Sequence, residues 1–558
     1  MASVPVETTE APDAPVEDRK LRKVVFAASA GTIFEAYDFI LFGSLAPLIS
    51  RQFFSQVNEA TGFIFALLTF AAGFVVRPFG ALVFGRMGDS SGRKKTFLIT
   101  ITVMGLATFG IGLLPTYASV GILAPILLIA LRLIQGLAYG GEYGGAVIYT
   151  AEHAPAAKRG LYVGWIQTAG GFALFLSFLV IFLTRSTLGE ARFEDWGWRV
   201  PFLISILLLG ISLWVRMTLD ESPAFKKMLA EGKASKRPLS EAFLQWRNLR
   251  LVLIVLFGMM SVQGVLWYTA HFYTQFFLTQ ILHVAPARIT LVMMLVTIVS
   301  VGLYILFSWL SDKVGRKPIM LAGMILSVVT AFPLFHALTA AVNPALAEAQ
   351  ARAPVIVHAD PAQCSVQFDP LGSARFDSSC DIATGALARA GISYDSRDDA
   401  AGGVARVTIG DRVVASDEGR ALDPAALKAL RGDVSARIDA ALAEAGYPAE
   451  ADPARVNLVA VFGIILLLVT FSVMCYAPIP AMVVEVFPTR IRYSALSLPY
   501  HIGSGWFGGF LPAIVFAIVA ATGNIYSGLW YPVIVTAIGV VVLAFLLPER
   551  LAIDLDEA

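Results

Sequence analysis

The chain has 558 residues, of which 57% are hydrophobic and only 15% are charged, and its mean hydropathy is +0.71. Soluble domains carry about 25% charged residues, and a single hydrophobic core stops growing at about 250–300 residues, so this apolar excess does not fit a soluble fold. The net charge of +1 excludes a nucleic-acid binder with a basic surface, and three cysteines exclude a disulfide-rich scaffold or a cysteine-rich metal site. The composition predicts a polytopic membrane protein rather than a soluble enzyme or a disordered chain.

Twelve segments are apolar enough to cross a bilayer as helices, which takes about 20 residues each. They lie at 24–49, 61–85, 96–114, 120–150, 160–183, 200–217, 251–280, 287–310, 318–341, 456–481, 493–521 and 526–547. The short alternating segments that are typical of membrane β-strands do not occur in the sequence. The sequence therefore predicts an all-α membrane protein.

Lysine and arginine gather in alternate loops. If the N-terminus is cytoplasmic, the basic clusters at 19–23, 86–95 and 216–250 are also cytoplasmic, and the loops on the other side hold few basic residues. The positive-inside rule then predicts an inner-membrane protein with both termini in the cytoplasm. Segment 1–18 is rich in proline and acidic residues, so we expect a disordered tail rather than a signal peptide.

Two motifs recur along the chain. GRMGDSSGRKK (85–95) follows the second span and SWLSDKVGRKP (308–318) follows the eighth, while EHAPAAKRG (152–160) follows the fourth and EVFPTRIRY (485–493) follows the tenth. Each pair maps one helix onto the helix six places later, which predicts two six-helix bundles. The members of the second pair lie farther apart than those of the first, so an insertion must lie between helices 8 and 10.

The predicted chain has seven parts. They are a cytoplasmic tail (1–23), an N-terminal bundle (24–217), a cytoplasmic linker (218–250), helices 7–9 (251–341), an insertion (342–454), helices 10–12 (455–547) and a second cytoplasmic tail (548–558). The insertion has more acidic than basic residues and no apolar run of membrane length, so we expect a small extracytoplasmic α/β domain. Local patterns predict strands at 355–359 and 365–368, a hairpin at 405–415 and helices at 380–391 and 423–446, the last beginning at Asp423 and Pro424.

The cysteines fall in two settings. Cys364 and Cys380 both lie in the insertion, where an oxidising compartment predicts a structural disulfide between them. Such a bridge stabilises a domain by about 3 kcal/mol on the chain-entropy estimate. Cys475 lies within helix 10, and we expect it to be a small buried apolar residue.

The paired D-x-x-G-R-K loops on a 6+6 layout resemble the major facilitator superfamily of secondary transporters. More narrowly, GTIFEAYDF (31–39), RPFGALVFGRMGDSSGRKK (77–95) and RLIQGLAYGGEYGGA (132–146) resemble its metabolite:proton symporter branch. The resemblance covers everything except the first tail and the insertion, which departs from the usual family pattern. It implies transport of small carboxylates, shikimate, or zwitterions such as proline and betaine.

Ionisable residues inside the predicted N-terminal bundle suggest a proton-coupling network, because each charge within a membrane is costly. The candidates are Glu35 and Asp38 in helix 1 and Arg132 and Glu142 in helix 4. A carboxylate beside an arginine keeps a low pKa and takes up a proton when the arginine is engaged elsewhere. The family resemblance favours a pairing of Asp38 with Arg132, because related sugar symporters place an acidic residue of helix 1 against an arginine of helix 4. The alternative is that these charges are structural pairs between helices.

Arg77 in helix 2 is the predicted substrate ligand, because a guanidinium holds a carboxylate through two parallel hydrogen bonds. Its alternative role is packing against the Asp89 loop. Uncharged polar residues could line the same cavity, namely Gln135, Tyr139, Gln167, Tyr268, His271 and Gln275. An aromatic helix 7 that faces lipid or core, with His271 at the membrane interface, is the alternative for the last three, and an interfacial location is also favoured for His501.

The repeated loops predict a latch between the two halves at the cytoplasmic side. The predicted gating residues are Asp89, Arg93, Asp312, Arg316, Glu152, Arg159, Glu485 and Arg492. The alternative, a plain topology signal, explains Lys94, Lys95 and Lys317 but not the two aspartates. Glycines in AGGFALF (169–175) and GSGWFGG (503–509) are expected to permit close helix approach as the halves rock.

The sequence favours a proton-driven symporter of a small, anionic organic metabolite, such as a mono-, di- or tricarboxylate. Its expected partners are the substrate, protons and the lipid bilayer, without nucleic acid, cofactor or metal, and a monomer is favoured. The alternatives are a proline/betaine-type zwitterion symporter and an uncoupled facilitator with a periplasmic binding or regulatory module. An enzyme or receptor built on the insertion is disfavoured, because the insertion has one histidine, His358, and no nucleophile motif.

Overall fold

The structure is a computed structural model, and it describes residues 33, 36–37, 40–57, 59–91, 93–140, 150–151, 154–217, 243–365, 376–399, 403–448, 451–487 and 492–547. The side chains of 59–60, 85–91, 93–97, 156, 215–216, 424 and 492–494 are not described. The predicted tails and most of the predicted linker lie outside these residues.

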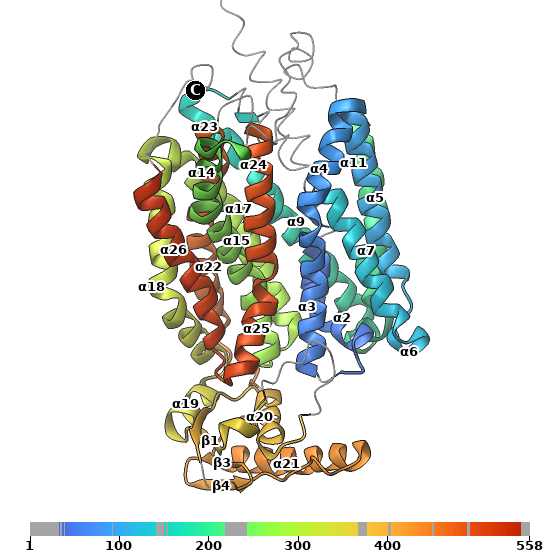
Figure 1. Ribbon diagram of the computed structural model, residues 1–558, viewed down its shortest axis with the longest axis vertical. Helices are drawn as coiled ribbons and strands as arrows, with labels where there is room; N and C mark the ends of the chain where they lie inside the picture. Colours follow the sequence, from blue (N-terminus) through green and yellow to red (C-terminus); the bar gives the residue numbers. More distant parts are fainter. Residues whose placement is uncertain are drawn as a thin grey trace, which may run out of the picture.

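Two bundles of helices stand side by side, with the insertion at one end (Figure 1). The N-terminal half contains α2 (Ala46–Phe53), α3 (Glu59–Val75), α4 (Arg77–Ser91), α5 (Arg93–Leu113), α6 (Tyr117–Val120), α7 (Leu123–Tyr139), α9 (Arg159–Leu188), α10 (Glu190–Arg192), η2 (Phe193–Gly197) and α11 (Arg199–Met217). The short 3-10 turn η1 (Ala156–Lys158) leads into α9.

The C-terminal half begins with one long span that contains three π-helical stretches, in the order α14 (Trp246–Val255), η3 (Leu256–Met260), α15 (Ser261–Tyr268), η4 (Thr269–Tyr273), α16 (Thr274–Phe276) and η5 (Phe277–Ile281). It continues with α17 (Pro286–Val314), α18 (Arg316–Val342), α22 (Leu458–Tyr476), α23 (Ile479–Val486), α24 (Arg492–Tyr500), η7 (His501–Gly508), α25 (Leu511–Thr522), η8 (Ser527–Leu529) and α26 (Trp530–Leu546).

Among the described residues, eight helices are long and apolar enough to cross a membrane, or nine if the bent pair Glu190–Gly197 and Arg199–Trp214 is one span. Leu98–Leu113 and Leu123–Tyr139 are shorter apolar helices. Helices α9, α17 and α18 are longer than the predicted apolar spans, because they include polar residues at their ends that a search for apolar runs leaves out. The twelve predicted spans stay a prediction.

Small residues let the helices of the N-terminal half approach closely. A Cβ added to Gly136 of α7 would lie 1.8 Å from the carbonyl oxygen of Gly73, and one added to Gly140 would lie 2.1 Å from that of Arg77. Backbone therefore packs directly on backbone between α7 and the α3–α4 span, which is how membrane helices gain contact without a hydrophobic driving force.

The glycine prediction for helix 5 holds for one of the two glycines of the AGGFALF string. A Cβ added to Gly171 would lie 3.6 Å from Val301 of α17, whereas nothing lies within 4 Å of a Cβ added to Gly170. Gly160 and Gly164 of the same helix, α9, approach α17 more closely. A Cβ on Gly164 would lie 2.3 Å from the Ser308 hydroxyl oxygen. The prediction for helix 11 agrees with the structure, because a Cβ on Gly503 or Gly508 would collide with Met260 or Tyr268.

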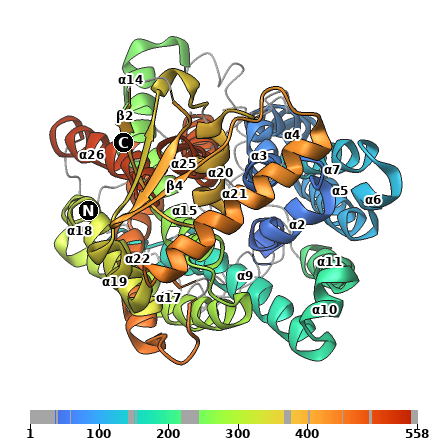
Figure 2. The same cartoon turned by 90° about the horizontal axis from the view of Figure 1, so that it is seen from below.

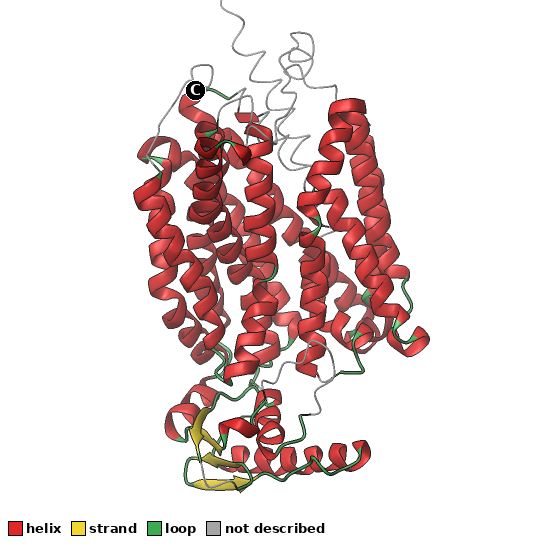
Figure 3. Cartoon of the chain, viewed as in Figure 1, coloured by secondary structure: helices red, strands yellow, loops and turns green. Residues whose placement is uncertain are grey.

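The insertion is an α/β unit, and it holds the strands of the described structure (Figure 3). Its elements are α19 (Pro344–Arg352), β1 (Val355–Ala359), η6 (Pro361–Gln363), α20 (Ser379–Arg389), β2 (Asp395–Asp398), β3 (Arg406–Ile409), β4 (Arg412–Ala415) and α21 (Pro424–Glu444). The sheet order is β2-β1-β3-β4, with β1 parallel to β2 and antiparallel to β3.

The local predictions for the insertion can be compared with this structure. The first strand, the hairpin and both helices are present. The hairpin turns at Gly410, which has φ +57°. Asp423 caps α21 by accepting hydrogen bonds from the amides of Ala425 and Ala426. Of the predicted strand 365–368, Ser365 is not in a strand and the rest lies outside the described residues. The sequence missed β2, because all four of its residues are exposed and show no alternation.

The insertion packs against one end of the C-terminal half, and its helix α21 runs beneath α2 and α3 of the other half (Figures 1 and 2). Cys364 and Cys380 form a disulfide with a Cα–Cα distance of 5.1 Å, and Cys475 is a buried free cysteine. The bridge fastens the segment after η6 to the first turn of α20.

The backbone contact at Gly136 leads to a stability prediction. Gly136→Ala should destabilise the protein by about 1–3 kcal/mol, because the methyl group has no room against Gly73. The matched control is Gly170→Ala, where the added methyl group meets open space and removes glycine's entropic cost in a helix. Thermal melting of the detergent-purified variants measures both effects, and equal melting temperatures for the two variants would contradict this packing.

Candidate functional site

A buried carboxylate joins the two halves at the end of the bundle opposite the insertion. Glu485 of α23 accepts hydrogen bonds from Arg316 of α18, at 2.6 and 2.7 Å, and from Arg159 at the start of α9, at 2.9 Å. All three side chains are buried, so water does not hydrate the carboxylate, and the two guanidinium groups compensate its negative charge instead. Arg159 belongs to the N-terminal half and the other two to the C-terminal half.

Asp312, near the end of α17, extends this network. Its carboxylate accepts from Arg316 at 3.1 Å and from the backbone amides of Gly160 and Leu161, at 2.8 and 2.9 Å. These amides are orphan donors in the first turn of α9, where a negative charge is favourable. An aspartate from one half therefore caps a helix of the other half, and Gly160 is needed because a Cβ there would lie 2.6 Å from the same carboxylate.

The structure brings together four of the eight predicted gating residues, which are Asp312, Arg316, Arg159 and Glu485. Glu152 lies outside the described residues, as do the side chains of Asp89, Arg93 and Arg492.

Arg132 is fully buried in α7 and its position is fixed by a chain of hydrogen bonds. The Thr108 hydroxyl donates to the Met104 carbonyl oxygen, so it accepts from the Gln135 amide nitrogen at 2.7 Å. This turns the amide oxygen of Gln135 toward Arg132, whose Nη1 donates to it. The other terminal nitrogen of Arg132 donates to the Phe70 carbonyl oxygen at 3.1 Å.

The guanidinium of Arg132 also lies 4.4 Å from the centroid of the Phe42 ring, which comes from the predicted helix 1. Glu35, Asp38 and Glu142, the predicted acidic partners, lie outside the described residues.

Arg77 begins α4 and is buried between two aromatic faces. Its guanidinium carbon lies 4.1 Å from the Phe74 ring centroid and 3.9 Å from that of Tyr139, which are good cation–π distances. Phe74 in turn packs edge-on against Tyr268 of the C-terminal half, with ring centroids 5.7 Å apart. Arg77 therefore lies close to the boundary between the two halves, in contact with Tyr139.

The predicted residues of helix 7 are buried. The His271 ring stacks on Trp267 at 4.8 Å, and its Nδ1 lies 2.9 Å from the Trp267 carbonyl oxygen. His271 and His501 are each only 2% exposed, so neither side chain faces lipid or water along its helix. Their depth in the membrane, and with it the interfacial alternative, stays a prediction.

Gln275 and Gln167 are also buried, in α16 and α9. Tyr268 packs on Phe70 and Phe74 of α3, with ring centroids 6.0 and 5.7 Å apart.

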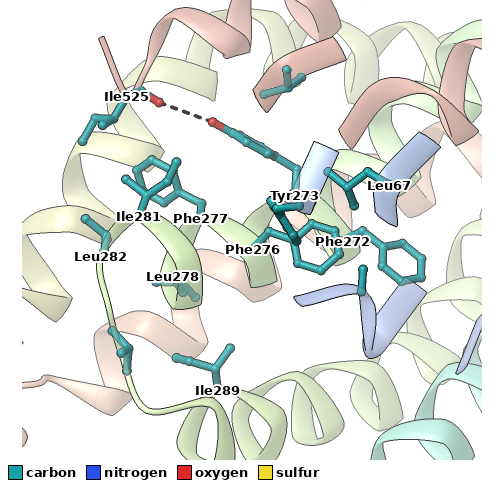
Figure 4. Close-up of a cluster of buried hydrophobic side chains, with 14 of the residues drawn as sticks. Leu67, Phe272, Tyr273, Phe276, Phe277, Leu278, Ile281, Leu282, Ile289 and Ile525 are labelled. Atoms are coloured by element: carbon teal, nitrogen blue, oxygen red, sulfur yellow. Dashed lines mark hydrogen bonds between the residues drawn. The ribbon is translucent and has the colours of Figure 1, made fainter. Parts of the chain in front are cut away.

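Sequence reasoning missed the phenylalanines that join the halves. We call Phe63, Phe70 and Phe74 of α3, together with Tyr268, Phe272, Phe276 and Phe516, the aromatic seam. Phe63 meets Phe276 and Phe516 edge-on at 5.3 and 4.9 Å, and Phe70 meets Phe272 at 5.4 Å. A phenylalanine within an apolar span carries no signal of this role. Figure 4 shows Phe272 and Phe276 in the buried cluster that continues from the seam.

A pocket elsewhere in the described part of the chain has no buried charged group, and no metal site is found among the described residues. A pocket between α15, α18 and α26 is lined by apolar and hydroxyl side chains such as Leu266, Thr269 and Phe335, without a charged group. Within the described residues, no group of three or more histidine, cysteine or acidic side chains is placed to hold a metal ion. The charged groups buried between the helices are therefore the candidate site.

Removing the Glu485 charge should destabilise the protein. Glu485→Gln removes the carboxylate that Arg159 and Arg316 share and leaves Asp312 as the remaining acid of the network, so one buried positive charge is no longer compensated. Breaking a buried ion pair in this way costs about 3–5 kcal/mol. The matched control is Glu444→Gln, because Glu444 makes a bond of similar length, 2.7 Å, to Arg412 with both side chains more than half exposed. We expect the control to lose no more than about 1 kcal/mol. Melting temperatures in detergent measure both, and a Glu485→Gln protein as stable as the control would contradict the assignment.

Comparisons with known proteins agree with this architecture. The family profile described as "Sugar (and other) transporter" matches residues 23–242 and 440–558. The proline/betaine transporter of Escherichia coli K12 is 36% identical over 332 residues, which are 57% of this chain and 65% of that protein. The chain thus spans slightly less than two thirds of that relative. The shikimate transporter of the same strain is 36% identical over 327 residues, 58% of this chain and 73% of that protein.

Solved structures show the same fold at low sequence identity. A D-xylose–proton symporter has a TM-score of 0.59 at 16% identity, covering 95% of this chain and 98% of its own. The xylose transporter from E. coli in a partially occluded inward-open conformation has a TM-score of 0.55 at 15% identity, with the same coverage. The chain belongs to the sugar (and other) transporter family of the major facilitator superfamily, a family of multi-pass membrane transporters rather than enzymes.

Proposed function

We propose that the protein is a proton-coupled symporter that takes up a small organic metabolite carrying a carboxylate, by alternating access. The observation that carries the proposal is the burial of two arginines in the N-terminal half, Arg77 and Arg132, which contact Phe74 and Phe70 of the aromatic seam respectively. A buried charge in a membrane is expensive and calls for a functional reason. Neither arginine belongs to the Glu485 network, which has its own arginines.

Arg77 is the proposed carboxylate ligand. The rings of Phe74 and Tyr139 both lie against the guanidinium of Arg77, and a guanidinium is the side-chain group that binds a carboxylate through two parallel hydrogen bonds. Proline, betaine and shikimate, which name the relatives, are different molecules that all carry a carboxylate. Gln167, Tyr268, His271 and Gln275 are proposed to orient the rest of the substrate.

Arg132 is the proposed partner of the proton-carrying acid. Asp38 precedes Phe42 by four residues in the sequence, a spacing that places two side chains on one face of a helix, and Phe42 lies against Arg132. A carboxylate beside this fixed guanidinium stays ionised until the guanidinium is engaged elsewhere, and then it takes up a proton. Glu35 and Glu142 are proposed as further members of this network.

The Glu485 network is the proposed latch between the halves. Its closed form ties Arg159 and the start of α9 to the C-terminal half, and opening this side requires these bonds to exchange. Alternating access joins states only a few kcal/mol apart, so contacts on the opposite side must offset the loss of these bonds when this side opens. The sequence repeat places Asp89, Arg93, Glu152 and Arg492 on the same side as the Glu485 network, and we propose them as further members of this latch.

A zwitterion symporter of the proline/betaine type is the second candidate. The aromatic seam favours it, because Phe74 lies against Arg77 and packs on Tyr268, which stacks on Phe272, and rings of this kind bind quaternary ammonium groups. A substrate with both groups would place its carboxylate on Arg77 and its cation on the seam.

The proposed topology has twelve spans in the inner membrane, both termini in the cytoplasm and the insertion in the periplasm. The distribution of basic residues supports this orientation, and so does a disulfide in the insertion, because disulfides persist in oxidising compartments. The protein is proposed to act as a monomer.

The first experiment finds the ligand and then tests coupling. A thermal-shift screen of small carboxylates and betaines identifies it, since a ligand at 100 times its Kd adds about 2.7 kcal/mol to stability. Asp38→Asn should then abolish accumulation driven by a pH gradient in proteoliposomes while leaving counterflow exchange measurable, because a neutral amide carries no proton. Wild-type accumulation by this variant would refute the coupling role of Asp38.

The second experiment tests charge recognition. Arg77→Lys should weaken binding of the identified ligand by about tenfold or more, because a point charge cannot replace two parallel hydrogen bonds. Arg51→Lys is the control, since Arg51 is exposed and pairs with Glu194 at the protein surface. The Kd is measured in detergent, and equal affinities of wild type and Arg77→Lys would assign Arg77 to structure instead.

A further inference from the structure

A short segment of the insertion, 391–394, is wedged between the ends of two membrane helices. The backbone amide of Tyr394 donates to the Gly523 carbonyl oxygen at 3.2 Å, and the Ser393 hydroxyl accepts from the Ile525 amide at 3.1 Å. Ile392 and Tyr394 are buried. The segment thus adds backbone hydrogen bonds to the turn that joins α25 to α26.

Two glycines make this close fit possible. Gly391 has φ +66°, and a Cβ there would lie 2.5 Å from the Ile281 carbonyl oxygen at the end of η5. Gly523 has φ +70° and ends α25, and a Cβ there would lie 2.2 Å from the Tyr394 ring. The left-handed conformation favours glycine at both positions, and the missing side chains bring insertion and helix ends into contact.

The wedge is itself held firmly by the insertion. Tyr394 is buried, and this burial raises the pKa of its hydroxyl to about 12; Thr384 of α20 is the neighbouring polar side chain. The disulfide from Cys380 anchors the first turn of the same helix. The two helix ends are therefore in contact with a segment that is fixed within the folded insertion, rather than with a separate loop.

The two helix ends also contact each other and carry the aromatic seam. The Tyr273 hydroxyl donates to the Ile525 carbonyl oxygen at 3.4 Å, a bond drawn in Figure 4. Phe276, shortly before Ile281, and Phe516, shortly before Gly523, both meet Phe63 of the N-terminal half. The ends that the insertion holds are therefore the ones that form the contact between the halves on this side.

We propose that the insertion is a brace that locks the end of η5 to the α25–α26 turn, so that this side opens by movement of the whole C-terminal half. The π-helical stretches η3, η4 and η5 give the span before Ile281 points at which it can bend by itself, because such stretches weaken the regular helical ladder. The brace suppresses this bending. Its consequence for transport rests on the proposed alternating access, whereas the mechanical claim does not.

Hydrogen exchange measured by mass spectrometry on the full-length protein in detergent tests the brace without a substrate. The variant combines Ser393→Ala with Tyr394→Ala, which removes the hydroxyl acceptor and the ring but keeps the backbone. We expect the amides of 277–284 and 522–528 to exchange about tenfold faster, corresponding to about 1.4 kcal/mol of lost protection. The amides of α5 in the N-terminal half should stay unchanged.

The control is Val413→Ala, an exposed position on strand β4 of the same insertion, which should leave all these peptides as in wild type. Gly523→Ala changes the other partner of the same contact. It should also speed exchange at 277–284 and 522–528, because its methyl group displaces the Tyr394 ring. Unchanged exchange at 277–284 and 522–528, with α21 still protected, would overturn the proposal. An equal increase in every helix would also overturn it, since the segment would then support the whole fold. Neither result depends on proton coupling or on the substrate.

Discussion

A carboxylate that is buried between two arginines, one from each half, sets the constraint on which the arrangement of the helices depends. Glu485 is compensated by Arg316 of its own half and Arg159 of the other, so separating the halves at this end would leave a charge buried without its full set of partners. Asp312 adds a helix cap across the same boundary. Because these bonds are charged and geometrically defined, we propose that the contact changes between discrete closed and open states, as alternating access requires.

The rest of the boundary is made of close contacts between small residues and of ring contacts. α9 approaches α17 closely where Gly164 faces Ser308, whereas α3 meets the C-terminal half through the rings of the aromatic seam. Ring contacts are each worth about 0.5–1.5 kcal/mol and have no hydrogen bonds to break. The costly polar bonds are thus concentrated at one end, the apolar contacts run along the middle, and the insertion holds the helix ends at the other side.

Local and periodic features of the sequence predicted much of this structure. The repeated motifs identified Asp312, Arg316, Arg159 and Glu485 because charged residues in an apolar chain are conspicuous, and the hairpin and α21 followed from turn and cap chemistry at Gly410 and Asp423. Features that depend on which face of a helix meets which neighbour could not be read. The sequence does not distinguish Gly164 from Gly170, or Phe63 from a lipid-facing phenylalanine, and it favoured an interfacial location for His501 without any sign that its side chain is buried. Strand β2 was missed because an exposed polar strand lacks alternation.

A distance measurement across the network end tests the account most directly. Spin labels at Met217 of α11 and Val314 of α17, both exposed, report the separation of the halves in a Cys475→Ala background, since the disulfide leaves no other thiol. The account predicts one main distance in the otherwise wild-type protein and a shift toward longer distances when Glu485→Gln is added, with no shift for Glu444→Gln. Superimposable distance distributions with and without Glu485→Gln would contradict the claim that this carboxylate holds the halves together.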